Sequence, residues 1–374
     1  MFGQLHEIAN HTLFVEGLEP SLILKEPDVA SAVLHKSGDT LYVMDTGATP
    51  VFRARMIEAA ERLRPFDRLV LLNSHAHPDH TPNNSVLHEI PALTKEHYIS
   101  AVGIPFLDYA ARTKADFAGI GEYYHLEDGP GLPFGLITRL FKPFRWIYPD
   151  LIDRHFVNFM VSRVMSKFRP LEPSLETATP FEHTPAGPLP IQGLALTGWN
   201  LRDDVYVIES RGHTQDSVSF YLPKVKVLFL SDETVTWFNC WADSSAARVI
   251  RILEATLAMY HAGMVDVLIG GHQQDQFRGA AIPALIHRLI DNHQTLVNTL
   301  ELILAEHPTG LTVPQIYRKL SKFRSQPAID GFFREEFPKM PGMLKTAITY
   351  ALLEAGFTAE GAPGKKRFRR LGIY

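Results

Sequence analysis

Cysteine is nearly absent from this sequence, since Cys240 is the only one among 374 residues. A single thiol excludes both a disulfide framework within the chain and a metal cluster built on cysteine. No stretch approaches the roughly 18 uncharged apolar residues that a membrane-spanning helix needs. The N-terminus also lacks a basic segment followed by an apolar one, so we expect no secretory signal and a cytoplasmic protein.

An excess of charge of one sign is lacking as well. The formal net charge is -4, while 45% of the residues are hydrophobic and 21% are charged. This balance gives no general attraction to nucleic acids or anionic membranes. It is ordinary for a globular protein, and the length suits one large domain together with a small one.

Histidine, in contrast, is concentrated in one place. The hexapeptide His75-Ala76-His77-Pro78-Asp79-His80 directly follows an apolar run at residues 69–72 that predicts a buried strand. Its imidazoles and carboxylate suit Zn²⁺ and also Fe or Mn. Histidine makes up 17 of 374 residues, so three at fixed places occur by chance roughly once in 10⁴ windows. The hexapeptide therefore predicts a metal site on a loop at a strand end.

Other predicted strands also end in residues that bind metals. These candidate ligands are His213 after residues 205–208, Asp232 after residues 225–230, and His272 after residues 265–269. Near the N-terminus, the strand predicted at residues 41–44 ends in Asp45, and a helix beginning near Pro50 leads to the strand before the hexapeptide. This strand–helix–strand order favours an α/β fold.

In this order, the hexapeptide and the later residues resemble the metallo-β-lactamase fold superfamily, whose signature is His-X-His-X-Asp-His followed by His, Asp and His. The resemblance covers roughly residues 10–275 and implies a four-layer αββα sandwich that holds two divalent metal ions, with zinc expected and iron or manganese as alternatives. It implies that the first metal is bound by His75, His77 and His213. It also implies that the second is bound by Asp79, His80 and His272. Asp232 would then bridge the two metals, and Asp45 would brace the histidine loop from behind.

Two positions depart from the family pattern. The hexapeptide is followed by Thr81-Pro82-Asn83-Asn84, where many members have Gly-Gly-Asn or Ala-Gly-Gly, and Asp232 is followed by Glu233. Neither departure removes a ligand. Both change the surroundings in which the nearest substrate contacts are expected.

The resemblance implies hydrolysis by a hydroxide that bridges two metals, because a metal lowers the pKa of bound water from 15.7 to about 7. Asp79 is then the group expected to pass a proton to the leaving atom. For substrate binding, the sequence predicts contacts from Trp237, Phe238 and Asn83, since large aromatic residues could line an apolar pocket. Such a pocket favours an ester, lactone or thioester of a partly apolar small molecule.

We expect a catalytic domain over residues 1–280 and a small helical domain over residues 281–374. Within the first, residues 98–182 are rich in aromatic residues, and helices are predicted at 98–118 and 136–168. This insertion could cap the active site, and it could also pack on its own domain or form a dimer interface. Its mixture of apolar and basic residues would also suit a membrane surface.

The final segment begins with an amphipathic helix predicted at residues 281–306. A short helix after Thr312 and a third one ending at Gly356 follow. Residues 357–371 then read as a hairpin. Helices closed by a hairpin suggest a winged-helix-like domain.

Two other activities stay open. Lactamase-like endoribonucleases also have a small helical domain besides the catalytic one, and the hairpin here carries basic residues that could bind phosphates. These are Lys365, Lys366, Arg367, Arg369 and Arg370. Iron-dependent members use nearly the same ligands for redox or oxygen chemistry. A scaffold with a vestigial site is disfavoured because no ligand position is missing.

Overall fold

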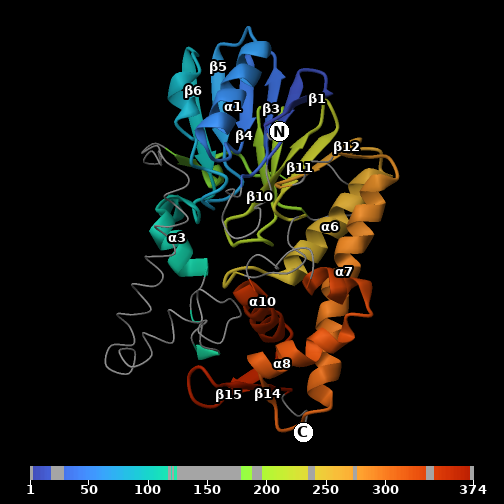
Figure 1. Cartoon of the computed structure of the whole chain (residues 1–374). Helices are drawn as coiled ribbons and strands as arrows, with labels where there is room; N and C mark the ends of the chain where they lie inside the picture. Colours follow the sequence, from blue (N-terminus) through green and yellow to red (C-terminus); the bar gives the residue numbers. More distant parts are fainter. Residues whose placement is uncertain are drawn as a thin grey trace. The chain divides into compact units, whose positions relative to one another are not determined.

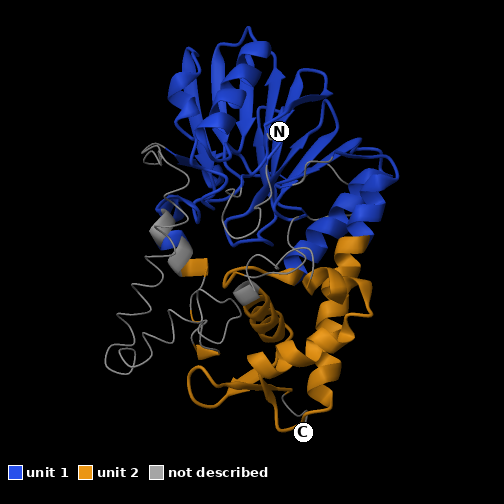
Figure 2. Ribbon diagram, in the orientation of Figure 1, with its two compact units in different colours: residues 1–112, 162–235, 247–287 blue, residues 113–161, 236–246, 288–374 orange. Residues whose placement is uncertain are grey.

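The structure is a computed structural model, and it describes residues 3–17, 29–116, 119, 122–123, 178–187, 196–234, 241–272, 276–333 and 341–370. The chain forms two compact units (Figure 2). The first consists of residues 1–112, 162–235 and 247–287, and the second of residues 113–161, 236–246 and 288–374.

The first unit contains two β-sheets (Figure 1). The seven-stranded sheet runs in chain order through β1 (Leu5–Ala9), β2 (Thr12–Val15), β3 (Ala32–Ser37), β4 (Thr40–Met44), β5 (Arg68–Leu72), β6 (Thr94–Ile99) and β7 (Thr179–Pro180). The six-stranded sheet has the order β13 (Phe277–Arg278), β12 (Val267–Gly270), β11 (Val227–Ser231), β10 (Val218–Leu222), β9 (Val205–Glu209) and β8 (Gly198–Leu201). In the first sheet, β4 to β7 are parallel, so their carboxyl ends lie at one edge.

Apolar side chains on both faces of the central strands explain why these sheets are layered. One face of the first sheet meets the second sheet in a core that contains Phe14, Tyr42 and Phe220. The other face packs on Phe52 and Met56 of α1 (Pro50–Arg62). α1 begins where the sequence predicts, because the Thr49 hydroxyl accepts a hydrogen bond from the Phe52 amide (3.3 Å) and proline occupies the first helical position.

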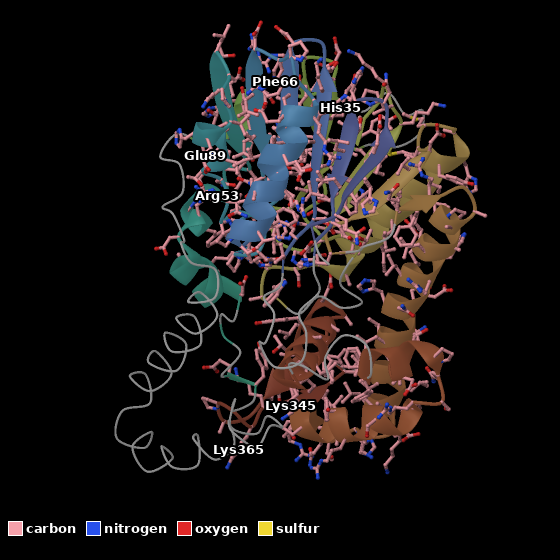
Figure 3. The ribbon with its side chains drawn as sticks, turned by 45° about the horizontal axis from the view of Figure 1, so that its top comes forward. His35, Arg53, Phe66, Glu89, Lys345 and Lys365 are labelled. Carbon is pink, nitrogen blue, oxygen red and sulfur yellow. The ribbon has the colours of Figure 1, made fainter. Side chains whose placement is uncertain are left out.

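Further helices complete the layers of this unit. α6 (Ala246–His261) buries Val249, Ile252 and Leu253, and Val249 lies close to Gly212 beyond the end of β9. α2 (Val86–Glu89) is joined to α1 by the ion pair between Arg53 and Glu89 (2.5 Å; Figure 3). The α/β sandwich that the sequence predicts is therefore confirmed.

The helix predicted at residues 98–118 is partly wrong. Tyr98 and Ile99 close strand β6, which pairs in parallel with β5, and a helix α3 forms only at Tyr109–Asp116, after a 3₁₀ turn at Ile104–Leu107. The reason is that β6 has a polar residue, His97, at a buried position and Ile99 as its only aliphatic residue, so it lacks the apolar run or alternation that marks a strand in a sequence. The helix predicted at 136–168 lies outside the described residues.

The second unit, together with the first part of α7, contains the helices and hairpin predicted at the end of the sequence. The elements are α7 (Ala281–Ala305), β14 (Leu311–Thr312), α8 (Val313–Leu320), α9 (Pro327–Gly331), α10 (Pro341–Glu354), β15 (Thr358–Glu360) and β16 (Arg367–Arg369). The strands form a sheet in the order β14-β16-β15, and its core includes Leu300, Ile316, Ile348 and Phe368. α7 continues through the division between the units at residues 287 and 288. The winged-helix assignment stays a prediction.

Among the residues that the structure describes, no helix is both long enough and apolar enough to span a membrane.

Candidate metal centre

Seven histidine and aspartate side chains of the first unit meet where strands of both sheets end. The hexapeptide follows β5, and three residues lie just beyond the ends of β9, β11 and β12: His213, Asp232 and His272. The structure thus brings together all seven residues that the sequence singled out as ligands. They form two groups that could each hold a metal ion, and Asp232 belongs to both.

The first group consists of His75, His77, His213 and Asp232. His77 Nδ1 lies 3.0 Å from His75 Nε2 and 3.1 Å from His213 Nε2. Asp232 Oδ2 completes the group at 3.3 Å from His213 Nε2 and 3.7 Å from His75 Nε2. Each side chain directs one donor atom at the same point, and all four are buried.

The second group consists of Asp79, His80, His272 and Asp232. Asp79 Oδ2 lies 3.0 Å from His272 Nε2 and 3.3 Å from His80 Nε2. Asp232 offers Oδ1 at 3.2 Å from His80 Nε2, and its Oδ2 is 3.5 Å from His272 Nε2. The carboxylate of Asp232 is therefore shared between the two groups.

These spacings fit tetrahedral metal coordination. Metal–nitrogen bonds of about 2.0–2.1 Å at tetrahedral angles place neighbouring ligand atoms about 3.3 to 3.4 Å apart. The observed distances of 3.0 to 3.7 Å bracket that value. His80 Nε2 and Asp232 Oδ1 are buried without a hydrogen-bond partner among the described residues, and buried polar atoms of this kind call for a ligand or ion. The residues present therefore fit a pair of metal ions.

The electrostatics of the two groups differ. Burial lowers the pKa of His213 to about 3, so this imidazole is neutral, which is the form that binds a metal. Burial acts in the same direction on His80, but the charges of Asp232, Asp79 and Asp45 raise its pKa well above the ordinary value. Three carboxylates around one imidazole create a site that favours a cation.

Asp45 holds the loop from behind, as expected from the resemblance. It lies at the end of β4, is fully buried, and accepts hydrogen bonds from the Ser74 amide (2.7 Å) and the Ser74 hydroxyl (2.7 Å). Its Oδ2 is also 2.9 Å from His80 Nδ1. A carboxylate at Nδ1 directs Nε2 of the same ring toward the second group.

Glycine is required at two positions beside the ligands. A Cβ at Gly271 would lie 2.0 Å from Asp232 Oδ1, and one at Gly212 would lie 2.2 Å from Glu233 Oε2. Both contacts are far inside the distance that real Cβ atoms keep. The backbone is therefore drawn tightly against the carboxylates of this site.

Glu233 is a functional residue whose role the sequence did not reveal. Its two carboxylate oxygens accept hydrogen bonds from the Gly212 and His213 amides (3.0 Å each), which fixes the loop that carries His213. Burial raises the pKa of Glu233 to about 7. Glu233, which departs from the family pattern, therefore holds the loop of His213 in place. In the sequence, the only sign of this role is its position directly after Asp232.

The structure describes one of the three predicted substrate contacts, Asn83. Trp237 and Phe238 lie outside the described residues. Asn83 is buried, and its amide donates hydrogen bonds to the carbonyl oxygens of Thr46 (3.1 Å) and Thr49 (3.2 Å). This amide therefore holds the loop before α1.

Comparisons with known proteins agree with this arrangement. The family described as "Metallo-beta-lactamase superfamily" matches residues 26–272. A metallo-beta-lactamase family protein from Thermus thermophilus has a similar structure, with a TM-score of 0.53, 15% identity, and coverage of 97% of this chain and 100% of that one. A beta-lactamase domain protein from Burkholderia ambifaria is also similar, with a TM-score of 0.54, 16% identity, and coverage of 99% of this chain and 94% of that one. At these identities, the likeness shows the fold alone. A search of curated protein sequences finds no significant match.

Proposed function

Because the chain belongs to the metallo-β-lactamase superfamily, we propose that it is a metal-dependent hydrolase that carries two zinc ions and cleaves an ester, lactone or thioester of a partly apolar small molecule. The observation that carries this proposal is the pair of donor groups that share the carboxylate of Asp232. We further propose that the protein acts in the cytoplasm.

Two bound divalent cations supply Lewis acidity and a hydroxide available at neutral pH. The residues that would hold the first are His75, His77 and His213, and those that would hold the second are Asp79, His80 and His272. Asp232 would bind both. Because these donors come from four strand ends, the fold holds them in place before a substrate arrives, which lowers the reorganisation needed during reaction.

Asp79 is suited to move a proton to the leaving atom. Its side chain is 13% exposed, whereas those of His80 and Asp232 are 0% and 5% exposed. The carboxylate therefore reaches the more open side of the donor cluster. Burial alone would raise the pKa of Asp79, but the charge of His80 and hydrogen bonds with His272 and His80 lower it well below its ordinary value, so this carboxylate is ionised. It would first accept the proton that the attacking water releases and then pass that proton to the leaving atom.

The endoribonuclease alternative receives less support from the basic hairpin. Lys366 Nζ pairs with Glu122 (2.9 Å), Arg369 pairs with Glu360 (2.5 Å), and the Arg367 guanidinium donates to the carbonyl oxygen of Gly310 (2.7 Å). Charges paired in this way are less available to phosphates.

The helix before the hairpin, α10, also gives the nuclease alternative little support. α10 carries one basic residue, Lys345, whose side chain is buried and lies 6.0 Å from the ring of Tyr317. A buried lysine cannot track a nucleic-acid backbone. α10 and the paired side chains of the hairpin therefore give the nuclease no specific support.

The test joins metal analysis to a substrate panel. Protein purified without added metal is analysed for zinc, iron and manganese, and is then assayed on an aryl ester, a lactone, a thioester and a phosphodiester. We expect two zinc ions per chain and turnover of the carbonyl substrates. Tightly bound iron with an optical or magnetic signature would replace the hydrolase by a redox enzyme, and phosphodiester turnover alone would support the nuclease.

The proton-transfer role has its own test. Asp79→Asn should slow turnover of substrates with poor leaving groups much more than that of activated aryl esters, whose leaving groups need no proton. An equal loss on both substrates at full metal occupancy would exclude this role.

A further inference from the structure

Asp216 is a buried carboxylate that the proposed chemistry does not use. It lies three residues after His213 and is fully buried. Its Oδ2 accepts a hydrogen bond from the Ala76 amide (2.9 Å). Its Oδ1 accepts hydrogen bonds from the Thr214 hydroxyl (2.8 Å) and from Nη1 of Arg112 (3.3 Å).

The partners of this carboxylate belong to two different loops. Ala76 lies between His75 and His77 in the hexapeptide, while Thr214 directly follows His213. Asp216 itself lies on the loop that carries His213, and its side chain binds the backbone amide between His75 and His77, so it joins the two loops that carry the histidines of the first group. It also has no direct role as a ligand, because it belongs to neither donor group.

Arg112 forms an ion pair with the carboxylate of Asp216. Its side chain is fully buried, and its guanidinium carbon lies 4.9 Å from the centre of the Phe106 ring. Gly103 closes the remaining space, because a Cβ there would lie 2.7 Å from Asp216 Oδ2. Three donors and the close approach of Gly103 therefore constrain the position of this carboxylate.

A buried ion pair contributes little net stability compared with an apolar pair of the same size, because both charges must leave water. Its better supported role is to specify one geometry. The second metal group already has such a brace, since Asp45 holds His80. In the first group, His75 Nδ1 faces the hydroxyl of Ser74 (3.0 Å), which itself donates to Asp45. The carboxylate of Asp216 contacts a backbone amide between His75 and His77 rather than an imidazole ring.

We propose that Asp216, held by Arg112, is a positioning residue that sets the spacing of the two histidine loops and so the affinity of the first metal group relative to the second. The inference rests on the proposed metal centre and is independent of the proposed substrate. Loss of a residue that orients metal ligands typically lowers metal affinity by about 10- to 100-fold. This loss should fall on the first group alone.

The experiment is a Co²⁺ titration of the metal-free full chain, followed by optical absorption and by competition with a chelator. His213→Ala and His80→Ala provide the reference signals of the second and first groups, respectively. In Asp216→Asn, we expect the affinity of the first group to fall by about 10- to 100-fold while that of the second is kept. Arg112→Gln should shift the same group by a smaller factor.

Asp204→Asn is the matched control. Asp204 is also a buried carboxylate of this unit, and it accepts hydrogen bonds from Ser37 (2.6 Å) and Tyr42 (3.0 Å) away from the metal groups. This control should lower the Tm of the metal-free protein without changing either Co²⁺ affinity.

Several results would overturn the inference. These are an unchanged first-group affinity in Asp216→Asn, an equal loss from both groups, or the same pattern in Asp204→Asn. If Asp216→Asn does not fold, Arg112→Gln decides, and wild-type affinity in that variant also overturns the inference. A wild-type chain that fails to bind two metals refutes the proposed function instead, so the two failures can be told apart.

Discussion

Replacing Asp45 by asparagine should remove the second metal without removing any of its ligands. Asp45 is fully buried and faces His80 Nδ1 at 2.9 Å. An ionised carboxylate only accepts hydrogen bonds, so the Nδ1 proton stays on His80 and Nε2 keeps its lone pair for the metal. Asparagine keeps the size of the side chain but presents an NH₂ group with donors of its own.

The magnitude follows from the contacts that change. The amide oxygen of asparagine can still accept the hydrogen bond of the Ser74 amide, which Asp45 Oδ1 accepts at 2.7 Å. The NH₂ group then meets the Ser74 hydroxyl and His80 Nδ1, and it favours the tautomer of His80 with its proton on Nε2. Loss of a partner that fixes the tautomer of a metal ligand typically lowers metal affinity about 10- to 100-fold. That corresponds to about 1.4 to 2.7 kcal/mol.

The assay has two measurements, each made on the wild type and on the variant. The first is the metal content after dialysis against a weak chelator, and the second is the Co²⁺ affinity of each group. Because the Ser74 hydroxyl that donates to Asp45 also lies 3.0 Å from His75 Nδ1, we expect Asp45→Asn to retain one metal per chain, with a large loss of affinity in the second group and a smaller one in the first. A variant that keeps two metals with wild-type affinity would refute the reasoning. Loss of both metals together with a large fall in the Tm of the metal-free protein would show a general folding role instead.

Other predictions concern metal content, stability and RNA binding. His80→Ala should leave one metal per chain by elemental analysis, whereas retention of both would contradict the second donor group. Burial lowers the pKa of His35 (Figure 3) from 6.5 to about 4, so the unfolded chain binds more protons between these pH values. The contribution of neutral His35 to stability is therefore full above pH 6.5 and should fall toward pH 4 by up to about 3 kcal/mol, a loss that His35→Phe should reduce in urea titrations. Glu233→Ala leaves two buried amides without their acceptor and should lower the free energy of unfolding by about 2 to 4 kcal/mol, measured in the same way. Lys366→Ala should leave any binding to single-stranded RNA unchanged in filter assays, and a large loss would revive the nuclease.

Much of the fold follows from local patterns in the sequence. Strands buried on both faces, such as β5 and β11, show as continuous apolar runs, and α1 is marked by its cap and its apolar spacing. β6 has no such signal, because even its buried position at His97 is polar. The ligand types could also be read directly, because the hexapeptide is contiguous and the later residues each follow an apolar strand.

Only the tertiary structure shows what holds those ligands in place. Asp216 and Ala76 are 140 positions apart in the chain, and Asp45 and His80 are 35 apart. No local pattern marks such pairs, because a carboxylate that accepts a backbone hydrogen bond from a distant loop has the same sequence signature as one in a turn. The sequence alone thus determined which chemistry the strand ends carry. Folding decided which of them share Asp232, and which buried carboxylates brace each half of the centre.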